Sequence, residues 1–180
     1  MSYKSKPLPL TFACAATESK LFPSDSGNEI ALCGRSNSGK STLINALANQ
    51  KKLAKTSNTP GRTQSINFFH LENNKQKKII DLPGFGYAKA SKQDQNSWAK
   101  LILSYLEKRA ALTDLILIMD MRHPFQNKDL EFLSLCESLN LPIHLVLTKA
   151  DKLNNKETQN TLKVVSEKMA DYPAIVDSLV

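Results

Sequence analysis

Short apolar segments alternate along the chain with longer segments in which apolar residues recur every three or four positions. The short runs predict buried β-strands, and the periodic segments predict helices with one buried face. Strands are expected at 29–34, 66–72, 76–82, 114–121, 142–149 and 174–180. Helices are expected at 40–50, 91–110, 127–139 and 155–170. This alternation predicts an α/β domain with a mainly parallel sheet.

Two segments depart from the simple alternation. The strands at 66–72 and 76–82 are separated only by the polar residues 73–75, which predicts a hairpin and therefore one antiparallel pair. Residues 55–65, KTSNTPGRTQS, are rich in Pro, Gly, Ser and Thr, which is typical of a loop without fixed structure.

Size and composition narrow the class of protein. A chain of 180 residues with 41% hydrophobic residues predicts one globular domain. The apolar runs at 115–119 and 143–147 are far shorter than the roughly 20 residues that span a bilayer, so we expect a soluble protein without a membrane partner. Cys14, Cys33 and Cys136 are scattered, which favours reduced thiols in the cytosol over a disulfide framework or a zinc site.

The segment GRSNSGKS, residues 34–41, follows a predicted strand and begins a predicted helix. It fits the phosphate-loop pattern G-x-x-x-x-G-K-[ST]. Gly34 and Gly39 permit the tight turn that points backbone amides at phosphate oxygens, Lys40 reaches the β and γ phosphates, and Ser41 ligates Mg²⁺. The context of strand and helix makes a chance Gly-Ser turn the weaker interpretation.

The segment DLPGF begins where another predicted strand ends. Asp81 and Gly84 have the Asp-x-x-Gly spacing with which a nucleotide switch senses Mg²⁺ and a terminal phosphate. Phe85 follows, where many such switches carry a Gln that orients water, and Phe cannot orient water by hydrogen bonding. This pattern predicts slow hydrolysis unless a partner or an ion supplies the missing charge.

The segment TKAD, residues 148–151, follows the predicted strand IHLVL. It predicts recognition of the base of a bound nucleotide rather than of its phosphates. The Asp151 carboxylate can accept hydrogen bonds from both N1–H and the 2-amino group of guanine, which adenine does not offer, and Lys149 can lie along the base plane. Taken alone this tetrapeptide is more often a solvated strand end, but its order after the two phosphate motifs favours guanine recognition.

Several residues keep two interpretations. Thr59 and Thr63 are both candidates to close on Mg²⁺ from the loop 55–65. Asn37 lies in the phosphate loop, where Asn tolerates a tight turn. Asp120 and Arg122 form either a structural ion pair or part of the site. His70, His123 and His144 show no ligand spacing.

The formal charge is +7, from 24 Lys and Arg against 17 Asp and Glu, which favours an anionic partner. Each lysine cluster is more often a solvated face. Several lysines near the predicted switch loops nevertheless make a nucleotide-dependent contact with nucleic acid a hypothesis. The excess charge comes from Lys51, Lys52, Lys55, Lys75, Lys77, Lys78, Lys89, Lys92, Lys108 and Arg109.

The segments GRSNSGKSTLINAL, TPGRTQ, DLPGFGYAK, MDMRHP and TKAD together resemble the EngB family (also YihA or YsxC) of bacterial ribosome-biogenesis GTP-binding proteins, over about residue 20 to the end. The resemblance implies a three-layer, Ras-like P-loop GTPase fold with one antiparallel edge strand. It implies a slow GTPase that acts as a switch in assembly of the large ribosomal subunit. A link to normal cell division and septation, a monomeric state and a cytoplasmic location follow from the same resemblance.

The resemblance also assigns residues. Ser41 and Thr63, rather than Thr59, are expected to ligate Mg²⁺. Asn37 resembles the Asn with which some related GTPases bind a K⁺ that replaces an arginine finger, and the alternative is that it only tolerates a tight turn. Asn37, Thr63 and Gly84 are the candidates for a role in catalysis. The residues expected to bind GTP or GDP are Gly34, Arg35, Ser36, Asn37, Ser38, Gly39, Lys40, Ser41, Thr42, Gly61, Arg62, Thr63, Gln64, Ser65, Asp81, Leu82, Pro83, Gly84, Thr148, Lys149, Ala150, Asp151 and Ser178.

We expect residues 1–28 to form an N-terminal extension that packs on a GTPase domain of residues 29–180. Members of the family continue past the segment that matches VDSLV with a guanine-contacting loop and a last helix. Ser178 is therefore expected to be a remnant of that loop, and the C-terminal helix is expected to be missing. The alternative functions are a GTP-dependent, non-catalytic scaffold at the division site and a P-loop kinase, and TKAD argues against the kinase.

Overall fold

A computed structural model describes residues 6–54, 65–85 and 92–180, and the side chains of 92–95 are left out of the description. The strands are β1 (Leu10–Ala16), β2 (Asn28–Gly34), β3 (Ile66–Leu71), β4 (Asn74–Asp81), β5 (Leu112–Asp120), β6 (Ile143–Thr148) and β7 (Ile175–Leu179). The helices are α1 (Lys40–Ala48), α2 (Lys92–Lys108), α3 (Asn127–Ser138) and α4 (Asn155–Met169). Two short 3₁₀ turns lie at Ser19–Leu21 and Ala150–Lys152.

The strands form one sheet in the order β1-β3-β4-β2-β5-β6-β7. The β3 strand pairs antiparallel with both of its neighbours, and the remaining neighbours pair parallel. The predicted α/β, Ras-like fold with one antiparallel strand is therefore confirmed. The antiparallel β3 lies one place in from the edge, because β1 covers it.

Sequence analysis did not predict β1. Its sequence, LTFACAA, lacks the regular alternation of a half-buried strand, and a register shift between Phe12 and Cys14 interrupts the pairing with β3. The β1 strand is held by this pairing and by backbone contacts to α1, where the Leu8 amide donates to the Leu47 carbonyl at 2.8 Å.

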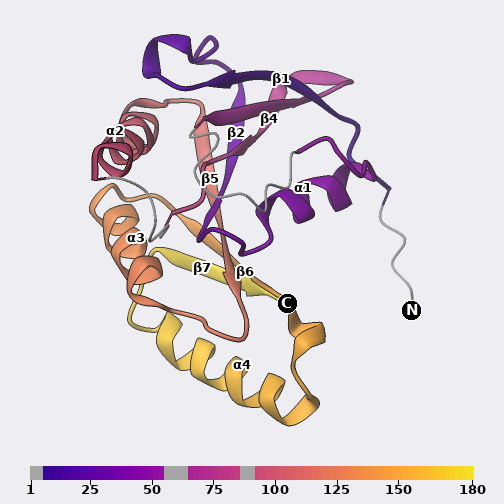
Figure 1. The fold of residues 1–180 in the computed structure, drawn as a ribbon, viewed down its shortest axis with the longest axis vertical. Coiled ribbons are helices and arrows are strands. Elements are labelled where there is room, and N and C mark those ends of the chain that lie inside the picture. Colours follow the sequence, from indigo (N-terminus) through magenta and orange to yellow (C-terminus); the bar gives the residue numbers. More distant parts are fainter. Residues whose placement is uncertain (1–5, 55–64, 86–91) are drawn as a thin grey trace.

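The sheet separates two layers of helix (Figure 1). The α2, α3 and α4 helices cover one face, and their buried residues belong to one large apolar cluster with the inner strands. The α1 helix covers the other face through Ile44 and Ala48. No helix among the described residues is long and apolar enough to cross a membrane.

Local sequence explains where the helices begin. Both α3 and α4 carry capping boxes, Gln126 with Asp129 and Asn154 with Glu157, which satisfy the free amides of the first turn. The α1 helix is different, because it begins after Gly39 without a side-chain cap. Its first amides are therefore available to an anion.

Candidate functional site

The candidate site lies at the carboxyl ends of the parallel strands β2, β4, β5 and β6. Open α/β sheets bind ligands at this edge, because the loops that follow neighbouring strands converge there. Four segments meet at this edge: 34–41, 81–85, 120–122 and 148–151. Three of them, 34–41, 81–85 and 148–151, carry the motifs that the sequence connects with a phosphate, a metal ion and a base.

The phosphate loop has the tight conformation that its glycines predict. Gly34 and Gly39 have φ values of 146° and 107°, in a region that favours glycine. A Cβ on Gly34 would overlap the carbonyl oxygen of Ile118 in β5. Asn37 has φ 64°, which confirms that it occupies a left-handed turn position.

Lys40 is buried, and its ammonium donates to the Gly34 and Arg35 carbonyls at 3.1 and 3.3 Å. Burial lowers the pKa of Lys40, and the nearby Asp81 carboxylate partly opposes this shift. Carbonyl oxygens compensate a buried cation only partly. A phosphate in the loop offers this cation a full negative charge.

Asp81 ends β4 and is 8% exposed. Burial raises its pKa to about 6, against the opposing effects of Lys40 and of a hydrogen bond from the Asn67 side chain. Its Oδ1 atom is buried without a hydrogen-bond partner in the described part of the chain. Sequence analysis missed Asn67, which lies opposite Asp81 in the β3–β4 pairing, since only the register identifies it.

Gly84 approaches the phosphate loop closely. A Cβ there would lie 2.9 Å from the Lys40 ammonium and 3.0 Å from the Ser36 Cα, so the position accepts only glycine without displacement. The next residue fixes this approach through the backbone: the Ser36 amide donates to the Phe85 carbonyl at 2.9 Å, and the Phe85 amide donates to the Gly34 carbonyl at 3.3 Å.

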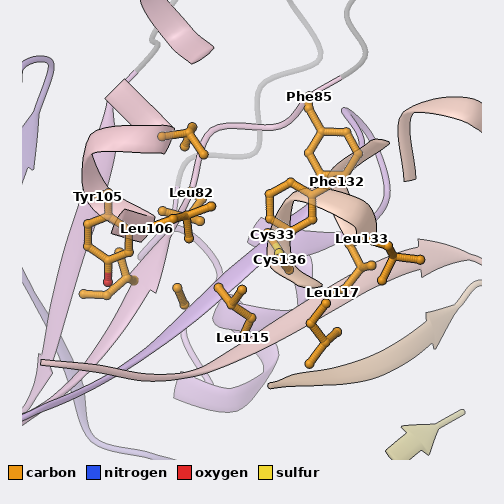
Figure 2. Packing of buried hydrophobic residues seen from close by; sticks show 14 of the residues in the cluster. Cys33, Leu82, Phe85, Tyr105, Leu106, Leu115, Leu117, Phe132, Leu133 and Cys136 are labelled. Atoms are coloured by element: carbon orange, nitrogen blue, oxygen red, sulfur yellow. The ribbon is translucent and has the colours of Figure 1, made fainter. Parts of the chain in front are cut away.

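The Phe85 ring is a core residue. It is 5% exposed and stacks on Phe132 of α3 at 5.0 Å between centroids (Figure 2). It also meets Trp98 of α2 edge-on at 6.3 Å between centroids. The Trp98 indole also donates to the Pro83 carbonyl at 3.3 Å. Phe85 therefore anchors the segment 81–85 between two helices, a role that the sequence comparison with Gln did not suggest.

The TKAD segment is bonded directly to the phosphate loop. The Thr148 hydroxyl donates to the Ser38 carbonyl at 2.6 Å, and the Lys149 ammonium donates to the Asn37 carbonyl at 2.7 Å. Asp151 follows in a 3₁₀ turn, and its side chain is 70% exposed beside Lys152. The carboxylate predicted to bind guanine is thus accessible to a ligand.

Asp120 and Arg122 belong to this network. The Arg122 guanidinium donates to both oxygens of Asp120, at 2.9 and 2.7 Å, and the Lys149 ammonium donates to Asp120 at 2.8 Å. These hydrogen bonds, that of Arg122 above all, hold the pKa of Asp120 well below its usual range. The structure therefore shows the ion pair that the sequence allowed and places it beside TKAD.

Arg35 has a different role from the other phosphate-loop residues. Its guanidinium donates to the His123 carbonyl at 2.7 Å and lies 3.0 Å from the buried Asp129 carboxylate of α3. Asp129 also caps α3, so this ion pair ties the loop to that helix. The Arg35 side chain therefore faces α3, and its backbone remains in the phosphate loop.

Of the remaining predicted residues, some lie in the segments that form the site, Ser65 lies next to β3, and others lie outside the described residues. Ser41 and Thr42 lie in the first turn of α1, Leu82 and Pro83 continue from Asp81, and Ala150 begins the 3₁₀ turn. Ser65 is buried, and its hydroxyl donates to Asn67 at 3.2 Å. Thr59, Gly61, Arg62, Thr63 and Gln64 lie outside the described residues.

The expectation that Ser178 lies in a loop is wrong. Ser178 lies inside β7, where it pairs with Leu145 of β6. The apolar and β-branched residues around it extend the strand through this position, so no loop forms there.

Comparison with known proteins identifies the family of the chain. The family model described as "50S ribosome-binding GTPase" matches residues 29–149. The chain is 47% identical over 161 residues to a probable GTP-binding protein EngB of Haemophilus influenzae strain PittGG, covering 89% of this chain and 78% of the relative.

Solved structures show the same similarity. A crystal structure of a probable GTP-binding protein EngB has a TM-score of 0.64 and 28% identity, covering 83% of this chain and 88% of the other. The NFeoB protein of S. thermophilus, bound to GDP·AlF₄⁻ and K⁺, has a TM-score of 0.52 and 26% identity, covering 72% and 47%. With the phosphate loop, the Asp81–Gly84 segment and TKAD around one site, the chain belongs to the EngB family of P-loop GTPases.

Proposed function

We propose that this protein is a GTP-dependent switch with slow hydrolysis that acts in assembly of the large ribosomal subunit. One observation carries the proposal: the phosphate loop is hydrogen-bonded on one side to TKAD, through Lys149 and Asn37, and on the other to the Asp81–Phe85 segment, through Ser36 and Phe85. A nucleotide bound at this loop therefore contacts both a base-recognition segment and a phosphate-sensing segment.

At the phosphate end, the uncapped amides of α1 and the Lys40 ammonium bind the phosphates. Gly84 lies against Ser36 and Lys40, so a terminal phosphate alters the contact between the loop and Gly84. Loss of that phosphate on hydrolysis restores the contact. This difference between the two nucleotide states is what a switch requires.

At the base end, Asp151 accepts from guanine N1–H and the 2-amino group, while the Lys149 stem lies along the base. Lys149 is held by Asn37 on one side and by Asp120 on the other, so its position does not depend on the nucleotide. A fixed site of this kind discriminates strongly, because the wrong base leaves a desolvated carboxylate without a donor.

The residues present fit Mg²⁺. Asp81 is buried, burial raises its pKa, and its Oδ1 has no hydrogen-bond partner in the described part of the chain, while the Ser41 hydroxyl lies one residue from Lys40. Ser41 and Thr63 would hold the ion, and Asp81 would hold its bound water. When bound, Mg²⁺ neutralises charge on the β and γ phosphates.

Hydrolysis is proposed to be slow in the isolated protein, because the Phe85 ring packs in the core and offers no hydrogen bond to water. Asn37, whose side chain is exposed at the loop, is proposed to hold K⁺ near the β and γ phosphates. Asn37→Ala should then abolish any acceleration by K⁺ over Na⁺. A parent rate identical in the two salts would rule out the cation.

The ribosomal partner is proposed from the family that matches residues 29–149, described as 50S ribosome-binding GTPases, and from the formal charge of +7, which suits ribosomal RNA. In this proposal the protein is a cytoplasmic monomer, and its link to cell division follows from its action on ribosomes.

Co-sedimentation with large ribosomal subunits tests the switch. Recovery should be high with a non-hydrolysable GTP analogue and low with GDP. The Asp151→Asn variant is a matched control, because its new amide should accept xanthine in place of guanine. It should co-sediment with a xanthosine triphosphate analogue and not with the GTP analogue.

Equal recovery of the parent with GTP analogue, GDP and no nucleotide would contradict the switch and favour a scaffold. Recovery of Asp151→Asn with the GTP analogue alone would contradict the base assignment.

A further inference from the structure

We propose that Asp120 is a positioning residue for base recognition, which acts by holding the Lys149 ammonium against the phosphate loop. The inference rests on the proposed function, because it assumes that Lys149 contacts the base. It adds a determinant of nucleotide affinity from β5, a strand that carries none of the three nucleotide motifs.

The sheet register brings Asp120 to this position. Asp120 ends β5 and pairs with Thr148, the last residue of β6, so its carboxylate lies beside the start of TKAD. The Met121 amide donates to the Thr148 carbonyl at 2.9 Å and fixes the two strand ends together. Asp120 is buried, so a cation that contacts it is partly withdrawn from water.

An anionic partner such as Asp120 is needed to fix the orientation of the Lys149 side chain. Its φ of 64° lies in the left-handed region, where a lysine is strained, and Asn37 on the opposite side has φ 64° as well. The Lys149 ammonium joins these two positions, with 2.7 Å to the Asn37 carbonyl and 2.8 Å to Asp120 Oδ2. A four-carbon stem is flexible, so a single carbonyl leaves it several orientations.

Arg122 fixes the carboxylate in turn. Its Nε donates to Asp120 Oδ1 at 2.9 Å and its Nη2 to Oδ2 at 2.7 Å, while its backbone amide donates to Oδ1 at 3.1 Å. A bidentate pair of this kind restricts the rotation of a carboxylate. Asp120 Oδ2, which accepts from Lys149, is thereby held in one orientation, and the Lys149 ammonium lies between it and the Asn37 carbonyl.

The test is a double-mutant cycle on GDP affinity, measured by calorimetry in Mg²⁺ with Asp120→Asn, Lys149→Met and the double variant. Asp120→Asn should weaken binding about tenfold, and Lys149→Met by at least as much. Asp120→Asn should have no further effect in the Lys149→Met protein, because Asp120 acts through the ammonium. Asp114→Asn, a second aspartate of β5 that contacts His144, is the matched control and should leave affinity unchanged.

A spectroscopic readout separates positioning from a general loss of structure. The ¹⁵N resonance of the Lys149 ammonium should be protected from exchange with water in the free protein and lost to exchange in Asp120→Asn, while the backbone amide spectrum remains that of a folded protein. If Asp120→Asn does not fold, Arg122→Gln replaces it. The Arg122 side chain is 40% exposed, and this variant should weaken binding about threefold, again only while Lys149 is present.

The outcomes distinguish this inference from the proposed function. If Lys149→Met weakens GDP binding but Asp120→Asn does not, or if Asp120→Asn weakens it equally in both backgrounds, the positioning role is wrong and the function stands. If Lys149→Met binds GDP as well as the parent, the base assignment and this inference fail together.

Discussion

The two sides of the nucleotide site differ in how their charges are compensated. On the base side, Asp120, Arg122 and Lys149 form a closed network of hydrogen bonds between 2.7 and 2.9 Å, and these bonds hold the pKa of Asp120 low. On the phosphate side, burial raises the pKa of Asp81 to about 6 and lowers that of Lys40.

This difference identifies the part of the site whose charge compensation depends on a ligand. Paired charges hold their geometry without help, so the base side is preorganised. A buried carboxylate with an unpartnered oxygen favours its neutral form, so the phosphate side holds charges that a cation and phosphates stabilise. The proposed switch requires this asymmetry, because the side with incompletely compensated charges is the one that a change in the number of phosphates would alter.

Phe85→Ala should have the largest effect, since it removes the anchor of the phosphate side. Loss of an aromatic ring stacked in the core should lower the free energy of unfolding by about 3–5 kcal/mol. The rate of hydrolysis should stay within about tenfold, which is roughly 1.4 kcal/mol in barrier height, because the ring does not face water. Urea unfolding and phosphate release measure the two quantities.

The control is Phe12→Ala, which removes an aromatic ring that is 47% exposed on β1 and should cost about 1 kcal/mol or less. Equal losses of stability for the two variants would contradict the core role of Phe85.

Asp151→Asn should alter the base side alone. Replacing one acceptor by a donor that faces the guanine amine should cost about 2–4 kcal/mol of GDP affinity and should admit xanthosine diphosphate. The unfolding free energy of the free protein should stay nearly constant, because this side chain is 70% exposed. A variant that binds GDP as tightly as the parent in calorimetry would refute guanine recognition by this residue.

How much of this asymmetry the sequence could predict depends on the range of the contacts. The motifs at 34–41, 81–84 and 148–151 were identified because each is a local pattern, and the buried run of β5 predicted its strand. The contact between Lys149 and Asn37 joins residues 112 positions apart and depends on two left-handed backbone positions, which no local pattern specifies.

Phe85 shows the same limit in another form. The sequence indicated only that the Phe85 side chain cannot orient a water molecule by hydrogen bonding. Its stacking on Phe132 depends on how α3 packs against the sheet, which is a tertiary property.

Asp81→Asn should change how the stability of the protein depends on pH, because it removes the buried carboxyl of the phosphate side. A carboxyl whose pKa is raised on folding binds its proton more tightly in the folded state, so stability falls as the pH rises from about 4 to about 6. The variant should remove this fall and should be more stable than the parent at pH 8, by at most about 3 kcal/mol. Denaturant titrations of the free protein at about pH 4.5 and about pH 8 measure it.

The same variant should lose the contribution of Mg²⁺ to GDP or GTP affinity. Asp81 is not an incompletely compensated charge if the stability of the parent relative to Asp81→Asn does not fall between about pH 4 and about pH 6. The same conclusion follows if the Asp81→Asn variant keeps the full response to Mg²⁺.

Substitution of His144, which lies outside the site, should have the smallest effect on stability and serves as a reference for its pH dependence. Its two ring nitrogens contact Asp177 at 2.7 Å and Asp114 at 3.3 Å, and these hydrogen bonds, that of Asp177 above all, raise its pKa. The stabilisation is therefore present below about pH 6.5 and is lost as the pH rises through the raised value. His144→Gln should remove a few tenths of a kcal/mol at about pH 6 and nothing at about pH 9, because the group is partly exposed.

The most direct measurement is a pH titration of the aspartate side-chain carboxyl carbons by ¹³C NMR, in the free protein and with Mg²⁺ and GDP. In the free protein, Asp81 should titrate near pH 6, while Asp120 should remain ionised throughout the range in which the protein is folded. With Mg²⁺ and GDP, the pKa of Asp81 should fall below its ordinary value of 3.8, and Asp120 should not change. If Asp81 and Asp120 titrate together in the free protein, or if Mg²⁺ and GDP leave the pKa of Asp81 unchanged, the two sides do not differ as described.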